Sequence, residues 1–185
     1  MIAFCLASGA SLNQEDVDFI KGKGRVYAVN DSYRLAPWAD VLYAADAAWW
    51  DWHIGNLSDF KGEKRSPDFA TCKKYNLSYV QIDMSAAWGE GGRVAHGGNS
   101  GFQALNMAVN DGAHAVYLLG YDMGYTDKKH WFGDHPKKLD RSSDYKKWIE
   151  NIKKAVPHIP VPVYNCSEMS AIDCFSKVDL REHLR

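Results

Sequence analysis

The sequence has no excess of charge of either sign and no long hydrophobic run. It contains 22 Lys and Arg residues against 23 Asp and Glu residues, for a formal net charge of -1 at pH 7. A balanced chain gives no electrostatic reason to expect nucleic acid or an anionic membrane as a partner. The apolar start, "MIAFCLASGASL", carries no basic residue and is too short to cross a bilayer. We therefore expect a cytoplasmic protein without a membrane span.

Paired cysteines are also missing. The four cysteines, at positions 5, 72, 166 and 174, form no CxxC pair and no tight cluster with histidine, which argues against a zinc site. Cys5 lies in an apolar run, where packing is its expected role. The chain has no internal repeat, low-complexity tract or linker. Its 185 residues are therefore expected to form a single domain, 1–185, with a substantial core.

Short apolar segments alternate with segments of helical character. The predicted strands are 2–7, 25–30, 40–46, 78–83, 115–120 and 161–166, and the predicted helices are 13–24, 101–112 and 144–156, with 47–56 as an aromatic helix or loop. Prolines in the last strand place it at a sheet edge or at a strand start. This alternation predicts an α/β fold, a single Rossmann-like domain with a mostly parallel sheet and helices on both faces.

Polar residues follow most of these predicted strands. In open parallel sheets, ligands bind beyond the carboxyl ends of the strands, at the point where the strand order reverses. The candidate ligand-binding residues after the strands are Ser8, Gly9 and Ser11, then Asn30 and Asp31, then Asp46, and finally Asp122. The turn "SGAS" has too few glycines for a dinucleotide or P-loop fingerprint, so it is either a phosphate cradle or an ordinary turn.

The segment "GGNSG" opens the predicted helix 101–112. Its glycines permit a close backbone approach, and Asn99 or Ser100 can cap the helix, with Gly101 in its first turn. The positive end of such a helix binds phosphate or carboxylate. The alternative is a capped helix that follows a loop and binds nothing.

Two further groups can carry chemistry. Asp46 and Asp122 are suited to cap a turn, to bind a ribose hydroxyl or to hold a metal ion. The segment "KKHWFGDHPKK" places His130 and His135 among four lysines. Histidine is suited to proton transfer, and lysines favour a phosphate-bearing leaving group. Residues 127–154 hold nine Lys and Arg against five Asp and Glu, which fits an anion-binding wall or a solvated surface.

The order of motifs resembles that of a known assemblage. "LASGASL", "AVNDSY", "VLYAAD", "GGNSGFQALNMA", "YLLGYDM", "GDHPKK" and "VYNCSEMSAI" occur in the order seen in Rossmann-like proteins that include bacterial sialyltransferases of the lipooligosaccharide type. The assemblage also includes archaeal 6-hydroxymethylpterin diphosphokinase-like proteins and small bacteriophage proteins. The resemblance spans nearly the whole chain.

Likeness to the sialyltransferases implies a role for each motif. The turn at Ser8 to Ser11 and Asn30 would face the nucleotide, and Asn99, Ser100 and Gly101 would meet the donor. His135 would be the general base, and the stretch with Asn165 and Ser167 would line the base pocket. Tyr121 or Tyr125 would match tyrosines of the family. Such enzymes need no metal. Likeness to the diphosphokinases would instead make Asp46 and Asp122 ligands of Mg²⁺ with ATP.

We therefore predict a transferase that uses a nucleotide-activated donor, most plausibly a glycosyltransferase with a CMP-sugar donor. His130 belongs to the predicted donor-binding set. The alternatives are a Mg²⁺-dependent diphosphokinase and a module that binds a nucleotide or metabolite without turnover. The expected partner is a nucleotide or nucleotide sugar, with no nucleic acid. The tryptophans at 49, 50 and 52 would stack a base or sugar, form a buried aromatic cluster, or provide a contact in a homo-oligomer.

Overall fold

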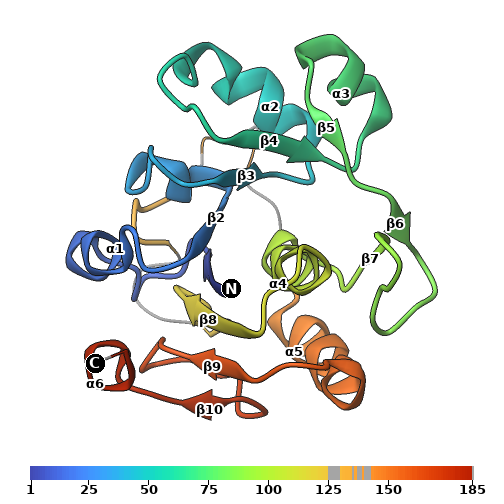
Figure 1. The fold of residues 1–185 in the computed structure, drawn as a ribbon. Coiled ribbons are helices and arrows are strands. Elements are labelled where there is room, and N and C mark those ends of the chain that lie inside the picture. Colours follow the sequence, from blue (N-terminus) through green and yellow to red (C-terminus); the bar gives the residue numbers. More distant parts are fainter. Residues whose placement is uncertain (125–129, 135, 137–138, 140–142, 185) are drawn as a thin grey trace.

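Eight strands pair in parallel into one sheet in a computed structural model that describes residues 1–124, 130–134, 136, 139 and 143–184. The strand order is β10-β9-β8-β1-β2-β3-β4-β5 (Figure 1). Their bounds are β1 Ile2–Leu6, β2 Arg25–Val29, β3 Val41–Tyr43, β4 Glu63–Ser66, β5 Ser78–Tyr79, β8 Ala115–Leu119, β9 Val163–Asn165 and β10 Ser176–Lys177. The chain builds outward from β1 to β5 and then returns to place β8 on the other side of β1. The strand order therefore reverses between β1 and β8.

Helices cover both faces of the sheet. They are α1 Gln14–Ile20, α2 Ala47–His53, α3 Phe69–Tyr75, α4 Ser100–Asn110, α5 Tyr145–Ala155 and α6 Leu180–His183, with short 3-10 turns η1 Asn30–Arg34, η2 Ile54–Asn56 and η3 Val156–His158. Figure 1 shows α4 and α5 on one side of the strands and α1 and α6 on the other. This arrangement confirms the predicted α/β class with a mostly parallel sheet. Within the described residues, no helix is long and apolar enough to cross a membrane.

Two hydrophobic clusters fill the space between the sheet and these helices. Alternate residues of β1 enter opposite clusters: Cys5 packs on the α4 and α5 side, and Phe4 and Leu6 pack on the α1 side, as the two-residue period of a strand requires. Burial raises the pKa of the Cys5 thiol to about 12, so this side chain is a neutral packing group. A sheet covered on both faces explains why its central strands are continuously apolar.

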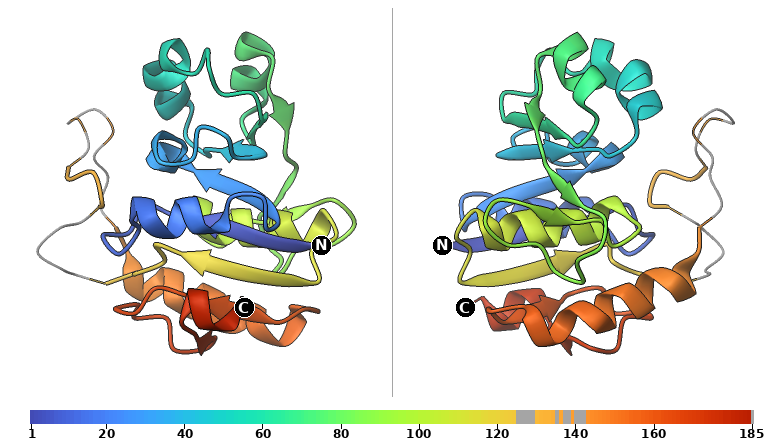
Figure 2. Two further views of the ribbon diagram at one scale, coloured as in Figure 1. Left: turned by 60° about the vertical axis from the view of Figure 1, so that its left-hand side comes forward. Right: turned by 90° about the vertical axis from the view of Figure 1, so that its right-hand side faces the viewer.

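A second sheet lies beyond α4. Its two strands, β6 Ile82–Asp83 and β7 Val94–Ala95, pair in parallel and flank α4 on the side away from the main sheet (Figure 2). The buried Asn106 of α4 holds the segment from Gly89 to Ala95 against the helix. Its Oδ1 accepts hydrogen bonds of 2.9 Å from the amides of Gly89 and Ala95, and its Nδ2 donates one of 2.9 Å to the Gly89 carbonyl.

Several sequence predictions need correction. The predicted strand 78–83 is two strands, β5 and β6, which belong to different sheets. For the segment 161–166 the sequence allowed a sheet edge or a strand start, and the structure shows the strand start: its prolines precede Val163, and β9 lies between β8 and β10. The elements that the sequence did not reveal are β4, α3, β7, β10 and α6. All of these are short, and β4, β10 and α6 are mainly polar.

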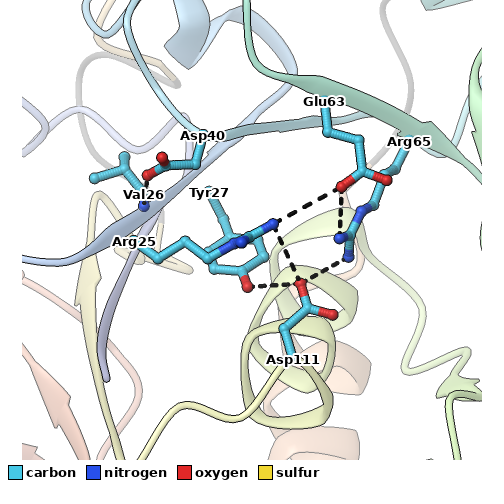
Figure 3. A network of polar contacts seen from close by, with 7 residues as sticks. All are labelled: Arg25, Val26, Tyr27, Asp40, Glu63, Arg65 and Asp111. Atoms are coloured by element: carbon cyan, nitrogen blue, oxygen red, sulfur yellow. Dashed lines mark hydrogen bonds and ion pairs between the residues drawn. The ribbon is translucent and has the colours of Figure 1, made fainter.

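A network of charged residues joins the C-terminal end of α4 to the sheet (Figure 3). Asp111, which follows α4, accepts hydrogen bonds at Oδ2 from the Tyr27 hydroxyl at 2.7 Å and from Arg65 at 2.8 Å. Arg65 also donates to Glu63 at 2.7 Å, and Arg25 lies 3.8 Å from Glu63 and 3.9 Å from Asp111. The Arg65 hydrogen bond holds the pKa of Glu63 below its ordinary value. Two positive and two negative charges therefore neutralise one another.

The Glu63 contact predicts a pH-dependent stability. Because its pKa is lowered on folding, the ionised carboxylate stabilises the fold above its unfolded pKa, and this contribution is lost as pH falls through the lower folded value. The substitution Glu63→Gln should cost stability above pH of about 5.5, and the difference from wild type should shrink below about 4.5. Urea unfolding from pH 3 to 7 measures this. The exposed Glu90→Gln is the control, with a change within about 0.5 kcal/mol. A Glu63→Gln deficit that is equal at all pH values would contradict the assignment.

Candidate functional site

A cavity of about 280 Å³ lies at the carboxyl ends of the strands, where the strand order reverses. It is lined by the turns that follow β1, β2, β3 and β8 and by the starts of α4 and α5. The predicted site residues that line it are Ser8, Gly9, Asn30, Asp46, Asn99, Ser100, Gly101, Asp122 and His130. Ser11, Asp31, Asn165 and Ser167 are not among its described lining residues. His135 and Tyr125 lie outside the described residues.

The turn after β1 is fastened to the end of β8. The Gly9 amide donates to the Gly120 carbonyl at 2.9 Å. The Ser11 amide donates to Asp122 Oδ2 at 2.8 Å, and the Ser11 hydroxyl donates to Oδ1 of the same carboxylate. A Cβ atom at Gly9 would lie 2.4 Å from the Gly120 oxygen and 2.6 Å from Asp122 Cγ. The absence of a side chain at Gly9 is therefore required by the protein's own backbone, independently of any phosphate.

The start of α4 presents hydrogen-bond donors to the cavity. Asn99 caps the helix, because its Oδ1 accepts from the Phe102 amide at 2.9 Å. The cap leaves the amides of Ser100 and Gly101 without a hydrogen bond to any described residue. The Asn99 Nδ2 and the Ser8 Oγ are buried and likewise make no hydrogen bond within the described part of the chain. The positive end of an 11-residue helix thus coincides with unsatisfied polar groups.

The end of β8 is held by the loop after β9. Tyr121 is fully buried and donates its hydroxyl proton to the Gly101 carbonyl at 2.9 Å. Its amide donates to Ser167 Oγ at 2.8 Å, and the Ser167 amide donates to Asn165 Oδ1 at 3.0 Å. Burial raises the pKa of Tyr121 well above its usual range, so this hydroxyl stays neutral. Asn165 and Ser167 are therefore buried supports of the cavity floor.

The wall after β2 contains unusual backbone. Asn30 has a φ of 51° and Met123, across the cavity, has a φ of 48°. Positive φ is uncommon for residues other than glycine and costs free energy that the surroundings must compensate. The buried Ser32 hydroxyl donates to the Ala7 carbonyl at 3.0 Å and so ties the turn after β2 to the end of β1.

Asp31 lies behind this wall. Its carboxylate accepts a hydrogen bond of 3.0 Å from Trp49 Nε1 and lies 3.7 Å from His53 Nε2. Trp49 stacks on His53 with ring centroids 4.3 Å apart. Trp49 and Trp50 are buried and Trp52 is half exposed, so the aromatic segment is mainly a core cluster. Of these three tryptophans, Trp49 alone lines the cavity.

The segment with His130 docks onto the turn after β1. The Trp131 amide donates to the Ser8 carbonyl at 3.2 Å, and His130 Nδ1 lies 3.3 Å from the same oxygen. A carbonyl only accepts hydrogen bonds, so this contact places the proton of a neutral His130 on Nδ1 and the lone pair on Nε2. The Arg34 guanidinium lies 5.3 Å from the Trp131 ring centroid, where a cation–π contact supports the docking.

The two candidate metal-binding acids contact the protein itself. Asp46 caps α2 by accepting from the Ala48 amide at 3.1 Å, and Asp122 holds the turn at Ser11. In the described ranges, no group of three or more His, Cys, Asp or Glu residues is placed to hold a metal ion.

Two aromatic residues at the cavity were not predicted as site residues. Tyr145 and Trp148, on the first turns of α5, both line it. In the sequence, Trp148 shares a helical spacing with Ile152 and Val156. The structure buries Ile152 but leaves Trp148 only partly buried. The i, i+3 spacing of Tyr145 and Trp148 places both on one helix face, which is the signal that could have found them.

The fold is similar to that of solved sialyltransferases. A structure of the sialyltransferase CST-II in complex with trisaccharide acceptor and CMP matches with a TM-score of 0.62 at 12% identity, over 96% of this chain and 86% of that chain. Structures of CstII from Campylobacter jejuni with cytidine-5'-monophosphate and with CMP-3FNeuAc give TM-scores of 0.62 and 0.59 at 11% and 10% identity. They cover 96% of this chain and 84% and 85% of theirs. At such identity the likeness establishes the fold.

Neither a protein-family model nor a curated protein matches the chain. The structural likeness agrees with the sialyltransferase part of the predicted resemblance. Likeness to diphosphokinase-like and bacteriophage proteins remains a prediction.

The close approach at Gly9 predicts a position-specific loss of stability. Gly9→Ala should destabilise the protein by about 1–3 kcal/mol, because the added methyl group forces the ends of β1 and β8 apart. Gly55→Ala is the matched control, since a Cβ there would meet no atom within 4 Å; its effect should be neutral or stabilising by up to about 1 kcal/mol. Urea unfolding measures both. Equal stability of the two variants would contradict the described geometry.

Proposed function

We propose that this protein is a glycosyltransferase that binds a nucleotide-activated sugar, with CMP as the nucleotide. The observation that carries the proposal is the cavity at the β1–β8 reversal, where the first amides of α4 meet the buried donors at Ser8 and Asn99. The similar folds include structures with bound CMP and CMP-3FNeuAc, which supports the choice of nucleotide.

The start of α4 is suited to hold the phosphate of the donor. A helix N-terminus carries partial positive charge and uncommitted amides, and both favour an anion. In the proposed reaction, the acceptor oxygen bonds to the anomeric carbon while the bond from that carbon to the phosphate oxygen breaks. The nucleotide leaves with the electron pair, so negative charge grows on the phosphate. The Ser100 and Gly101 amides and Asn99 Nδ2 would stabilise that charge, with no metal required.

The nucleoside would extend over the ends of β2 and β3. Asn30, Asp46 and Trp49 line that part of the cavity and offer amide, carboxylate and aromatic groups suited to a ribose and a base. Asn165 and Ser167, implied in the base pocket by resemblance, would act from below through their hydrogen bonds to the end of β8.

A histidine would accept the proton that the acceptor hydroxyl releases. We assign this role to His135 on the resemblance, and His130 to donor binding. His130 is the histidine that lines the cavity in the described part of the chain. Its contact with the Ser8 carbonyl makes Nε2 the basic nitrogen of a neutral ring. His130 and His135 must therefore be compared directly.

Nucleotide binding is tested by thermal stability. CMP or CMP-3FNeuAc at about 100 times its dissociation constant should add about 2.7 kcal/mol, which is a rise in Tm of roughly 5–10 °C, with or without Mg²⁺. Asn99→Asp is a sharp variant, because it keeps the cap oxygen, removes the Nδ2 donor and adds a negative charge beside the phosphate. It should fold with unchanged stability and lose at least about tenfold in affinity.

Three outcomes of these measurements would contradict the proposal. Stabilisation by ATP only with Mg²⁺ would instead favour the diphosphokinase alternative. Stabilisation by CMP-sugar without release of CMP on long incubation would favour a binding module. Unchanged affinity in Asn99→Asp would remove the start of α4 from the phosphate site.

The assignment of the general base is tested by measuring the release of CMP from CMP-sialic acid. His135→Ala should lower the rate by about 100-fold or more while the affinity for CMP stays within about twofold. His130→Ala is the comparison variant and should weaken donor binding more than it lowers the turnover of bound donor. The reverse pattern, with turnover lost in His130→Ala and retained in His135→Ala, would make His130 the base.

A further inference from the structure

The first turns of α5 form an aromatic wall on one side of the cavity. Tyr145 and Trp148 both line it, and their rings meet edge to face, with centroids 5.5 Å apart and an interplanar angle of 82°. Both side chains are partly buried, unlike Trp49, which is 3% exposed. Within the described lining, α5 is thus the side of the cavity where a broad aromatic surface is open to a ligand.

Trp148 is held in place by the loop that leads into α4. A Cβ atom at Gly98 would lie 3.0 Å from Trp148 Cδ1 and 3.3 Å from its Nε1, so the indole lies directly on the glycine backbone. Gly98 has a φ of 89°, a conformation that favours glycine. One turn further along α5, Asn151 Nδ2 donates to the Gly97 carbonyl at 3.0 Å. Helix α5 therefore fixes the glycine loop and the indole together, next to the amides of Ser100 and Gly101.

The position of the wall relative to the reversal of strand order suggests what it contacts. The cavity spans both sides of the β1–β8 boundary. Asn30, Asp46 and Trp49 lie after β2 and β3, on one side, while α5 follows β8, on the other. The start of α4 lies between them. If a phosphate occupies the start of α4 and a nucleoside occupies the β2–β3 side, the group on the other side of the phosphate is directed toward α5.

We propose that Trp148 is a donor-specificity residue that stacks against the sugar ring of the nucleotide-activated donor. This inference rests on the proposed function and extends it, since it assigns the sugar half of the donor to a defined surface. A flat indole suits the apolar C–H face of a pyranose, and the ring's hydroxyls stay directed to polar groups and solvent. The nucleotide half of the ligand makes no use of this surface, so the contribution of Trp148 belongs to the sugar alone.

The experiment compares two ligands on a set of tryptophan variants. Isothermal titration of wild type with CMP and with CMP-3FNeuAc gives the affinity ratio that the sugar adds. Trp148→Leu should lower the affinity for CMP-3FNeuAc by about tenfold and leave that for CMP within about twofold. Trp148→Phe, which retains a smaller aromatic face, should recover most of the loss. Trp38→Leu is the matched control, because Trp38 is also partly buried but lies outside the cavity lining; it should change neither affinity.

The outcomes separate this inference from the function on which it rests. If wild type binds neither ligand, the proposed function is wrong and this inference falls with it. If wild type binds both and Trp148→Leu weakens CMP as much as CMP-3FNeuAc, the indole contacts the nucleotide and the assignment to the sugar is wrong. If Trp148→Leu changes neither affinity, or Trp148→Phe fails to recover the loss although it folds with wild-type thermal stability, ring stacking is excluded.

Discussion

The site depends on the connection between β1 and β8 beyond the ends of those strands. The Gly9 amide donates a hydrogen bond to the Gly120 carbonyl. The Asp122 carboxylate accepts hydrogen bonds from both the amide and the hydroxyl of Ser11. These contacts extend the pairing of two adjacent parallel strands into the turns that follow them. The helices that follow the two strands, α1 after β1 and α5 after β8, lie on opposite faces of the sheet (Figure 1), and the cavity lies at this reversal of strand order. Asp122 thus contributes to the cavity chiefly by fixing its floor.

The two ends of α4 differ in how completely their polar groups are paired. Its last residues lie at the amino ends of the strands, where Asp111 joins a network whose charges neutralise one another. Its first residues lie at the carboxyl ends, where the amides of Ser100 and Gly101 and the Asn99 Nδ2 make no hydrogen bond within the described part of the chain. An unpaired buried donor costs about 1–3 kcal/mol. At the cavity, a ligand can supply the missing acceptors. In the charged network, most polar side-chain atoms have partners within the protein, so this cost is largely avoided there.

Much of this arrangement could be predicted from the sequence for physical reasons. Central parallel strands are apolar on both faces, so β1, β2, β3 and β8 are visible as short hydrophobic runs, and polar residues after them must converge at one edge. A cap at Asn99 or Ser100 follows from their place before the predicted helix, and the structure shows that Asn99 is the cap. Strand β4 escaped prediction because its sequence is "EKRS": Glu63 and Arg65 neutralise each other only after the chain has folded. The distinction between Asp46, which lines the cavity, and Asp31, which lies behind it, depends on Trp49, a contact that strand patterns do not encode.

The roles of Gly9 and Trp148 show why a residue type alone does not identify a ligand site. The glycine after the first strand left a phosphate cradle and an ordinary turn as alternatives, and the space beside Gly9 is filled by Gly120 and Asp122. Trp148 has the same helical spacing as the buried Ile152, yet it lies at the cavity, where its indole rests on Gly98 of the loop before α4. In both cases the deciding factor is a backbone approach between segments far apart in sequence. The shape of the cavity at this edge therefore depends on how closely the turns pack, and the two glycines permit those close approaches.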